Sequence, residues 1–268
     1  MFFSKKSGST LKVVDIAGTI RVAESKINRE YRHFEIIEQL IKMKEDDDIK
    51  GVLLRINSPG GTAGASMELA MTIEELVKEK PVVAHITDVA CSGALMASVA
   101  CNKIVANPMS TIGSIGVIMM IPNIKEVSDK LGIKMNVIKS APMKDIGNPF
   151  RDMTEEEQAY LKKSIEDGHK IFMDYVEEKR HTGKIKEIAD GKFFNAKDAL
   201  ELKLIDELGS LNYSMKLLES LANVDSEDVE WEYPKEKSGL VSRIVESLTG
   251  GFSNSIKTEM ENLLKIYY

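Results

Sequence analysis

One stretch in the first third of the chain limits the possible folds more than any other. Residues 51–56 form a compact apolar run that stops at the turn-forming sequence of residues 57–61, Asn-Ser-Pro-Gly-Gly. A helical pattern from about Ala65 to Lys78 follows directly. A short apolar run that ends at Gly and Pro before a helix is typical of a buried strand in a sheet. The stretch therefore predicts a strand, a tight loop and a helix in immediate succession.

The same alternation of strands and helices continues along the chain. Further strands are expected at residues 11–16, 82–86 and 103–106, and further helices at residues 29–44, 92–100, 154–180, 195–202 and 213–221. The helix from residue 154 begins with Thr154 and Glu157, the spacing of a capping box. This order predicts an α/β fold with a largely parallel sheet covered by helices. Ligands are then expected at loops after strands, and residues 58–61 and 90–94 are the two loops that contain glycine.

The length of 268 residues fits one large domain or a domain with an appendage. We predict a flexible leader at residues 1–10, one α/β domain at residues 11–232 and an amphipathic helical tail at residues 233–268. The tail carries two apolar stripes separated by Gly250 and Gly251. Its helices are expected to pack on the body or on a neighbouring subunit. A membrane-surface segment or a self-inhibitory segment is the alternative.

Charge and composition exclude several classes of function. The net charge of −6 offers no footprint for a nucleic-acid backbone, so nucleic acid is not expected as a partner. Two cysteines are too few for a disulfide framework, and no cluster of His and Cys predicts a metal site. Neither a transmembrane span nor an apolar region of signal-peptide length is visible in this sequence.

The four histidines do not favour a Ser-His-Asp hydrolase. His33, His169 and His181 lie on or beside charged helices and are expected to be solvated, whereas His85 in an apolar strand is expected in the core or behind a site. A lysine can replace histidine as the base when burial keeps it neutral. Ser92, at a strand-to-helix junction, is a suitable nucleophile for such a lysine, although it could merely cap the helix.

The glycines of the turn at residues 58–61 supply the second component that a hydrolase of this kind needs. A glycine after a buried strand can present its N–H without a side chain in the way, as an oxyanion hole requires. An ordinary turn is the alternative interpretation.

Several separate motifs, in order and spacing, resemble signal peptide peptidase A of bacteria and archaea. The matching segments are residues 56–61 (INSPGG), 90–93 (ACSG), 97–108 (ASVACNKIVANP), 112–117 (IGSIGV), 139–145 (KSAPMKD), 148–154 (NPFRDMT) and 191–194 (GKFF). The resemblance covers about residues 11–221. It implies a membrane-associated serine endopeptidase with a Ser-Lys dyad, on the fold shared by crotonases and the Clp proteolytic subunit. No metal or organic cofactor is implied.

The resemblance also implies roles for particular residues. Carried over by position, they are Ser92 as nucleophile, Lys144 as general base, the N–H groups of Gly60 and Gly93 as oxyanion donors with Gly61 as the competing choice for the first, and Ser114 as a candidate to hold the lysine amine. In the implied scheme, neutral lysine takes the serine proton and later protonates the leaving amine.

This chain departs from the family around the nucleophile. The family commonly has Ala-Ser-Gly-Gly-Tyr-Tyr, whereas this chain has Cys91-Ser92-Gly93-Ala94-Leu95-Met96. Aliphatic side chains beside the site put the substrate preference in question, and Leu95, Met96 and Ile56 are expected to line an apolar pocket. Cys91 is an alternative nucleophile, but the alignment and the glycine that follows favour serine.

Short members of this family assemble into rings or domes with active sites at subunit contacts, so the resemblance implies a homo-oligomer. Whether Lys144 serves the Ser92 of its own subunit or of a neighbour stays open. The family's N-terminal membrane anchor is missing from this sequence, which indicates either a soluble form or a chain trimmed before its anchor. In the second case, the removed anchor would associate the protein with a membrane.

The predicted function is hydrolysis of leftover signal peptides and other extended apolar peptides. A silent scaffold on the peptidase fold is one alternative, which retention of Ser92 and Lys144 disfavours. A crotonase-type enzyme acting on acyl thioesters is the other, and the lack of carboxylates at Ser92 and in residues 58–61 disfavours it.

Overall fold

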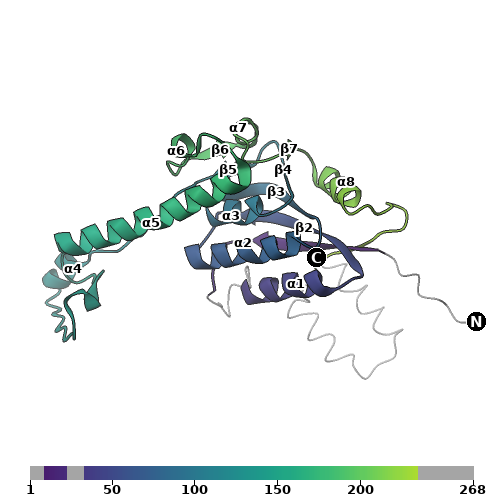
Figure 1. Ribbon diagram of the computed structural model, residues 1–268. Helices are drawn as coiled ribbons and strands as arrows, with labels where there is room; N and C mark the ends of the chain where they lie inside the picture. The colour runs from purple at the N-terminus through teal and green to yellow at the C-terminus, as the bar shows by residue number, and fades with distance from the viewer. Residues whose placement is uncertain (1–8, 23–32, 235–268) are drawn as a thin grey trace, which may run out of the picture. The chain divides into compact units, whose positions relative to one another are not determined.

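A mostly parallel sheet organises the protein, as the alternation of strands and helices predicts. The computed structural model describes residues 9–22 and 33–234 (Figure 1). Its strands are β1 (Thr10–Ala17), β2 (Ile49–Ser58), β3 (Val82–Cys91), β4 (Lys103–Ala106), β5 (Thr111–Gly113), β6 (Phe193–Asn195), β7 (Glu207–Leu208) and β8 (Glu230–Glu232). The order in the sheet is β6-β5-β3-β2-β1-β8, and β4 pairs with both β3 and β7. Among these described strands, the pairing of β5 with β6 is antiparallel and the others are parallel.

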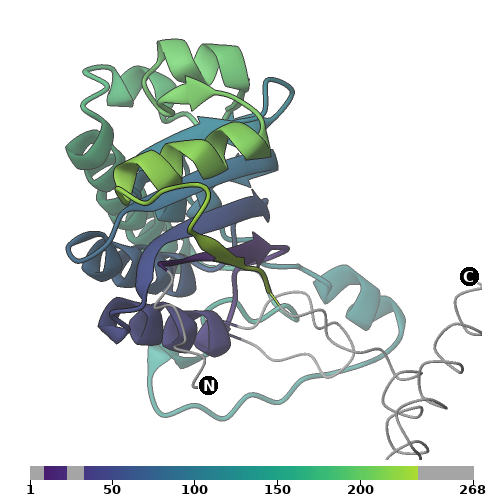
Figure 2. The ribbon, with the colours of Figure 1, turned by 90° about the vertical axis from the view of Figure 1, so that its right-hand side faces the viewer.

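Helices cover both faces of this sheet. The helices of the described residues are α1 (His33–Glu45), α2 (Ala63–Val77), α3 (Gly93–Val99), α4 (Lys125–Lys130), the 3-10 helix η1 (Pro142–Asp145), α5 (Glu155–Arg180), α6 (Ile185–Ile188), α7 (Ala196–Glu201) and α8 (Leu211–Leu221). α1, α2 and α3 cover one face, and Figure 2 shows α8 in front of the other. The fold class predicted from the sequence is therefore confirmed, and the fold is the Clp-protease-like α/β arrangement.

The burial of β2 shows why the sheet must be covered on both sides. Leu54 belongs to the larger apolar cluster under α1, α2 and α3, whereas its neighbour Leu53 belongs to the smaller cluster under α8. Both side chains are inaccessible to solvent. Since successive side chains of a strand point to opposite faces, a continuous apolar run needs a layer on each side. The run at residues 51–56 thus specifies a central strand.

α5 differs from the other helices because only part of it packs on the sheet layer. The capping box predicted at its start is present, with the Glu157 N–H donating to Thr154 Oγ1 and the Thr154 N–H donating to the Glu157 carboxylate. Phe172 and Val176, in the C-terminal half, are buried in the larger cluster. The N-terminal half extends beyond the sheet and ends near α4 (Figure 1).

Most elements predicted from the sequence lie where they were expected. β3 continues to Cys91 instead of ending at Ile86, and the short strands β5 to β8 were not predicted, because a strand of two or three residues has no detectable period. The expectation that His33 is solvated is wrong. His33 is 2% exposed, and its Nε2 lies 3.2 Å from Glu68 Oε2.

Most residues of the predicted leader and tail lie outside the part of the chain that the structure describes. Residues 1–8 of the leader and residues 235–268 of the tail lie outside the described residues, so their predicted character stays a prediction. Within residues 9–22 and 33–234, no helix combines the length and apolar character that crossing a membrane requires.

The double-sided burial of β2 yields a stability prediction. Leu54→Ala is expected to lower the free energy of unfolding by about 2–5 kcal/mol, because it removes a fully buried side chain and leaves a cavity. Leu221→Ala, the same change at a side chain that is 42% exposed, is expected to cost less than about 1 kcal/mol. Urea unfolding of both variants measures the difference. Equal costs would show that β2 is not a central core strand.

Candidate active site

Ser92 lies at the sharp junction between β3 and α3. Its backbone has φ 52° and ψ −124°, a conformation that non-glycine residues rarely adopt. The Ser92 N–H donates to the Gly113 carbonyl oxygen (2.8 Å), which ties the junction to the end of β5. Its side chain makes no capping hydrogen bond to α3. The hydroxyl therefore does not act as a helix cap, and strained backbone of this kind clusters at functional sites.

The turn after β2 packs directly against Ser92. Gly60 has φ 95°, and a methyl group on it would lie 2.6 Å from the Cys91 carbonyl oxygen and 2.8 Å from Ser92 Cβ. Only glycine fits such a close backbone approach. The turn predicted at residues 58–61 and the serine predicted at the next strand end are thus brought together, because both follow neighbouring parallel strands.

Two backbone N–H groups beside Ser92 are free to donate hydrogen bonds to a ligand. The Gly60 N–H donates to Ser58 Oγ (3.1 Å). Among the hydrogen bonds of the described residues, neither the Gly61 N–H nor the Gly93 N–H has an acceptor. The Gly61 nitrogen lies 3.5 Å from the position that a methyl group on Gly93 would take. The geometry therefore favours Gly61 over Gly60 as the partner of Gly93 in an oxyanion hole.

Ser114 lies one residue beyond the point where β5 meets β3. Cys91 and Gly113 are paired across these two strands, so the residues that follow them, Ser92 and Ser114, lie at neighbouring strand ends. Ser114 also has a positive φ of 54°, and its N–H donates to the Lys192 carbonyl oxygen (2.8 Å). Ser114 is therefore part of the cluster around Ser92.

Lys144 lies elsewhere in the chain. It belongs to η1 and is exposed. The next residue, Asp145, is ion-paired with Arg151, and Arg151 is ion-paired with Glu157 in the first turn of α5. α3 contacts α5, but the residues that α5 buries in the core lie around Phe172. Fifteen helical steps lead from Glu157 to Phe172 and span about 22 Å, so η1 lies beside the opposite end of α5 from the part that packs in the core.

The alternative nucleophile Cys91 lacks the environment that a reactive thiol needs. Cys91 is 8% exposed, and burial raises the pKa of its thiol. Its Sγ lies 3.9 Å from the Thr111 carbonyl oxygen, away from any cation. Since the thiolate is the reactive form, a raised pKa disfavours Cys91 as a nucleophile.

His85 is a core residue. Burial lowers the pKa of its imidazole, and the positive charge of the nearby Arg55 lowers this pKa further. The imidazole Nδ1 lies 2.8 Å from Ser214 Oγ of α8. The expected position of His85, in the core or behind a site, is therefore observed.

The residues expected to line a substrate pocket are packed in the core instead. Ile56 and Leu95 are fully buried and Met96 is 6% exposed, all within the larger apolar cluster. Ile56 lies on β2, and Leu95 and Met96 lie on α3, so burial leaves little of these side chains exposed for contact with a peptide.

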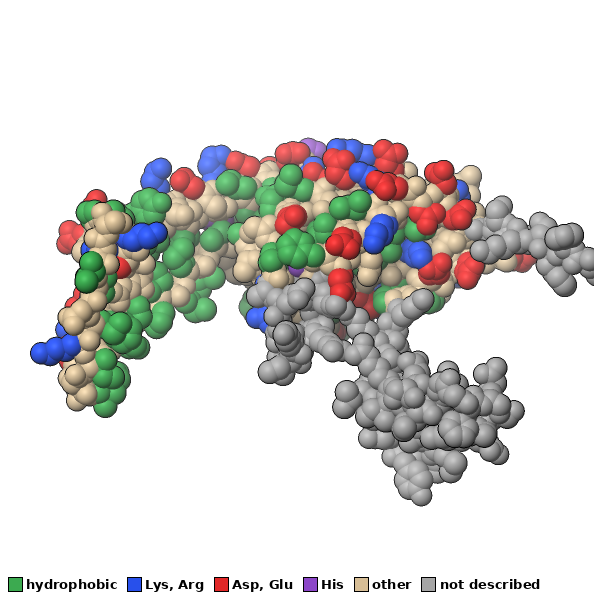
Figure 3. Space-filling model, turned by 90° about the horizontal axis from the view of Figure 1, so that it is seen from below, with side chains coloured by type: hydrophobic (Ala, Val, Ile, Leu, Met, Phe, Trp, Pro, Cys, Tyr) green, Lys and Arg blue, Asp and Glu red, His purple; other side chains and the backbone are tan. Residues whose placement is uncertain are grey.

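Apolar surface is found on a projecting segment that we call the arm, residues 118–166. Its exposed apolar side chains are Ile118, Met119, Met120, Ile124, Val127, Leu131, Ile133, Met135, Val137, Ile138 and Tyr160. Figure 3 shows apolar side chains gathered on the arm, at the left of the view. Exposed apolar side chains gathered on one segment are typical of surfaces that contact other macromolecules.

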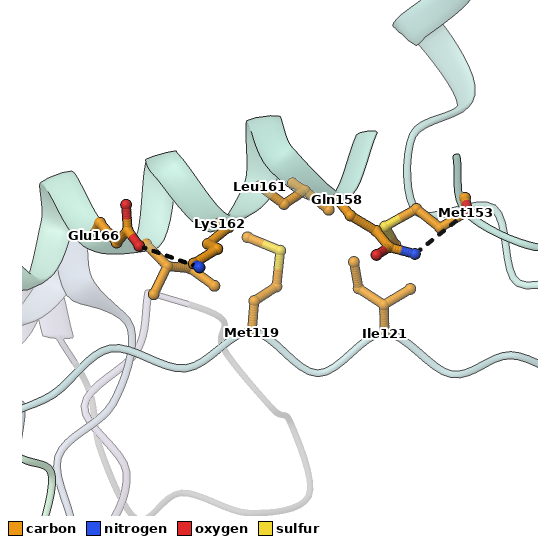
Figure 4. Close-up of a pocket in the computed structure, with 8 residues that line it drawn as sticks. Met119, Ile121, Met153, Gln158, Leu161, Lys162 and Glu166 are labelled. Atoms are coloured by element: carbon orange, nitrogen blue, oxygen red, sulfur yellow. Dashed lines mark hydrogen bonds and ion pairs between the residues drawn. The ribbon is translucent and has the colours of Figure 1, made fainter. Parts of the chain in front are cut away.

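A pocket of about 540 Å³ opens within the arm, between residues 119–121 and α5 (Figure 4). Met119, Ile121, Met153, Leu161 and Ile165 form its apolar lining. Gln158, Lys162 and Glu166 add polar groups at its edge. Neither Ser92 nor a glycine beside it is among the residues that line this pocket.

Comparisons with known proteins find two family models that match this chain. Residues 74–225 match the model of peptidase family S49, and residues 14–115 match the model of Clp protease. Because the first match covers more than half of the chain, the protein belongs to peptidase family S49. The class that the fold, the site and this family define is a serine peptidase.

Particular relatives narrow the class. The chain is 43% identical over 206 residues to a Methanocaldococcus jannaschii protein described as a protease, a match that covers 76% of this chain and 66% of that one. It is 34% identical over 195 residues to an Enterococcus faecium protein described as a signal peptide peptidase, covering 72% and 56%. The chain thus spans about two thirds or less of these relatives.

Among solved structures, the fold matches a serine-to-alanine mutant of the 1510-N membrane-bound stomatin-specific protease. The TM-score is 0.53 at 14% identity, and the match covers 86% of this chain and 99% of that one. This likeness shows a shared fold.

Sequence reasoning missed Ser66 of α2 as part of the site's construction. A methyl group on Gly93 would overlap Ser66 Oγ and lie 2.5 Å from Ser66 Cβ. Ser66 is fully buried, and its hydroxyl donates to the Thr62 carbonyl oxygen (2.9 Å). A small residue on the buried face of a helical pattern was the available signal. Its partner could not be identified because α2 and α3 are separated by a strand.

The contact between α2 and α3 gives a testable compensation. Gly93→Ala is expected to destabilise the protein by about 1–3 kcal/mol, because the added methyl overlaps Ser66. Ser66→Gly in the same chain removes both overlapping atoms and should restore most of the loss. Gly64→Ala, where no atom lies within 4 Å of the added methyl, is the matched control and should be nearly neutral. Thermal unfolding decides, and a double variant as unstable as Gly93→Ala would refute the contact.

Proposed function

We propose that the protein is a serine endopeptidase in which Ser92 attacks the scissile carbonyl and Lys144 is the general base. The observation that carries the proposal is the position of Ser92, at a strained junction beside the free N–H groups of Gly61 and Gly93. Donors aimed at the place where negative charge develops are a large part of catalysis by such sites. Membership of peptidase family S49 supports the same assignment.

The reaction needs only groups of the chain and water. The neutral Lys144 amine takes the Ser92 proton while Ser92 Oγ bonds to the carbonyl carbon, and the two N–H groups stabilise the tetrahedral oxyanion. The resulting ammonium protonates the leaving amine as the peptide bond breaks. Water then attacks the acyl-enzyme, with the same amine as its base, and releases the second product.

We further propose that Lys144 serves the Ser92 of a neighbouring copy. The length of α5 between the ion pair at Glu157 and the buried Phe172 supports this choice over the alternative in which one subunit holds both groups. The apolar arm, which carries Lys144, offers a surface for that neighbour to cover. A homo-oligomer, a ring or dome by family resemblance, is therefore part of the proposed function.

Ser92→Ala and Lys144→Ala are each expected to lower the rate on a fluorogenic signal-peptide-like substrate by at least about 10³-fold. The rate of the parent is measured as a function of pH in the same assay. When the two inactive variants are unfolded together and refolded as a mixture, activity should return, because intact Ser92 of one subunit meets intact Lys144 of the other.

The mixing experiment separates the two parts of the proposal. If the mixture stays inactive although native mass spectrometry shows oligomers that contain both variants, Lys144 serves its own subunit. If Ser92→Ala alone keeps its activity, the peptidase mechanism is wrong.

Leu161→Asp tests the arm as the surface between copies. A carboxylate in the apolar pocket should release smaller species and abolish activity while leaving the sheet domain folded. Lys163→Asp, two residues along α5 on a strongly exposed side chain, is the control and should keep both assembly and activity. Light scattering and circular dichroism measure the outcome, and intact, active oligomers of Leu161→Asp would refute this role of the arm.

Leftover signal peptides and other extended apolar peptides are the proposed substrates. The description of the Enterococcus faecium relative as a signal peptide peptidase supports this substrate class. We also propose that the protein acts at a membrane. The description of the structural relative as membrane-bound supports this location. Cell fractionation tests it, and recovery of the protein only outside the membrane fraction would contradict it.

A further inference from the structure

Arg151 connects the turn that carries Lys144 to the start of α5. On one side, its Nε donates to Asp145 Oδ2 and its Nη2 donates to Asp145 Oδ1, both at 3.0 Å. On the other side, Nη1 donates to Glu157 Oε2 at 2.8 Å and Nη2 donates to Glu157 Oε1 at 2.5 Å. Nη1 also donates to the Asp152 carbonyl oxygen, and Nη2 to that of Asp145. The guanidinium thus joins two carboxylates that belong to two different elements.

The turn has few other means of keeping its conformation. η1 has four residues, none of them buried, and a 3-10 helix of this length is not stable by itself. Lys139 adds a second cation, since its Nζ donates to Asp145 Oδ1 (2.5 Å) and to the Pro142 carbonyl oxygen (2.8 Å). Asn148 adds a long hydrogen bond to Asp145 (3.3 Å). Except for the bond to the Pro142 carbonyl oxygen, these contacts converge on Asp145, the residue next to Lys144.

Glu157 gives this network its rigid end. Its side chain is 3% exposed and closes the capping box of α5, so its carboxylate is fixed by the helix. Arg151 and the backbone of Thr154 lower the pKa of Glu157 to about 2. Arg151 and Lys139 likewise hold the pKa of Asp145 well below its usual range. Both carboxylates are therefore charged throughout the pH range of enzyme assays, and the network persists across it.

The positive and negative charges of the network are equal in number, and this balance affects the amine of the neighbouring Lys144. Asp145 and Glu157 contribute two negative charges, and Arg151 and Lys139 contribute two positive charges. Without Arg151, the Asp145 carboxylate would keep only one cation and would be free to attract the ammonium of Lys144. An opposite charge close to an amine favours its protonated form, which cannot act as a base.

We propose that Arg151 is a positioning residue for Lys144: it fixes the turn of Lys144 on α5 and keeps the Asp145 carboxylate occupied. This inference rests on the proposed function, in which Lys144 is the general base. A lysine could not replace Arg151 fully, because one ammonium does not bind two carboxylates in parallel pairs as a guanidinium does.

Arg151→Met tests the inference by steady-state kinetics on the full-length oligomer. We expect kcat to fall about 10- to 100-fold with KM nearly unchanged, because the base is misplaced while substrate contacts remain. We also expect the pH at half-maximal kcat to move upward. Arg151→Lys should recover part of kcat and most of the pH position. Lys163→Met, which also removes a positive charge from the arm, is the control and should behave like the parent.

Asp145→Asn separates the two parts of the role. It removes the ion pair with Arg151 and also the carboxylate that would attract the amine, so kcat should fall while the pH at half-maximal kcat stays at the parent's value. The same variant decides the question if Arg151→Met fails to assemble by light scattering. An unchanged kcat in Asp145→Asn would then overturn the inference.

The outcomes distinguish this inference from the proposed function. If Ser92→Ala and Lys144→Ala are inactive but Arg151→Met has the kcat and the pH profile of the parent, the positioning role is wrong and the peptidase mechanism stands. If Lys144→Ala is fully active, the proposed function fails whatever Arg151→Met does. A fall in kcat together with an equal rise in KM and an unmoved pH profile would indicate a general structural role and would also overturn the inference.

Discussion

The close packing of backbone at the ends of β2, β3 and β5 is the constraint on which the rest of the structure depends. Gly60 lies against the Cys91 carbonyl oxygen and Ser92, and Gly93 lies against Ser66. Each contact leaves no space for a side chain, so the backbone itself forms the walls of the site. Ser92 is held at positive φ because its N–H donates to Gly113 while α3 begins at the next residue. Burial of α3 and of the central strands stabilises this strained arrangement.

A second constraint is the division of the chemistry between two parts of the chain. Ser92, Gly61, Gly93 and Ser114 gather at the sheet, and the amine predicted to work with them lies on the arm. The half of α5 that extends beyond the sheet separates the two, and a helix of that length is stiff. The apolar surface of the arm has the same consequence for assembly, because apolar side chains outside the core favour burial against a second molecule. In the function that we propose, catalysis and association are thereby linked through one element.

The sequence predicted the core of the fold because its signals are local. The apolar pattern of residues 51–56 predicted a buried strand, and the pair Thr154 and Glu157 predicted the start of α5. Each of these patterns lies within a few consecutive residues. The placement of Ser92 at a strand-to-helix junction followed in the same way. Signals failed where the interaction partner is distant. β5 and β6 are three residues each and form through pairing, and His33 is buried by α2 although its own neighbours are charged.

By itself, the sequence determined the order of strands and helices, the junction that holds Ser92 and the glycines that allow close approach, because period, turn chemistry and capping act over short stretches of chain. Only the tertiary structure decided that the Gly60 N–H donates to Ser58 while that of Gly61 is free, and that Leu95 and Met96 are buried in the core. It also decided that Lys144 lies on the arm, next to a residue that Arg151 ties to α5. These features depend on which distant segments meet, and that is set by packing the layers against one sheet.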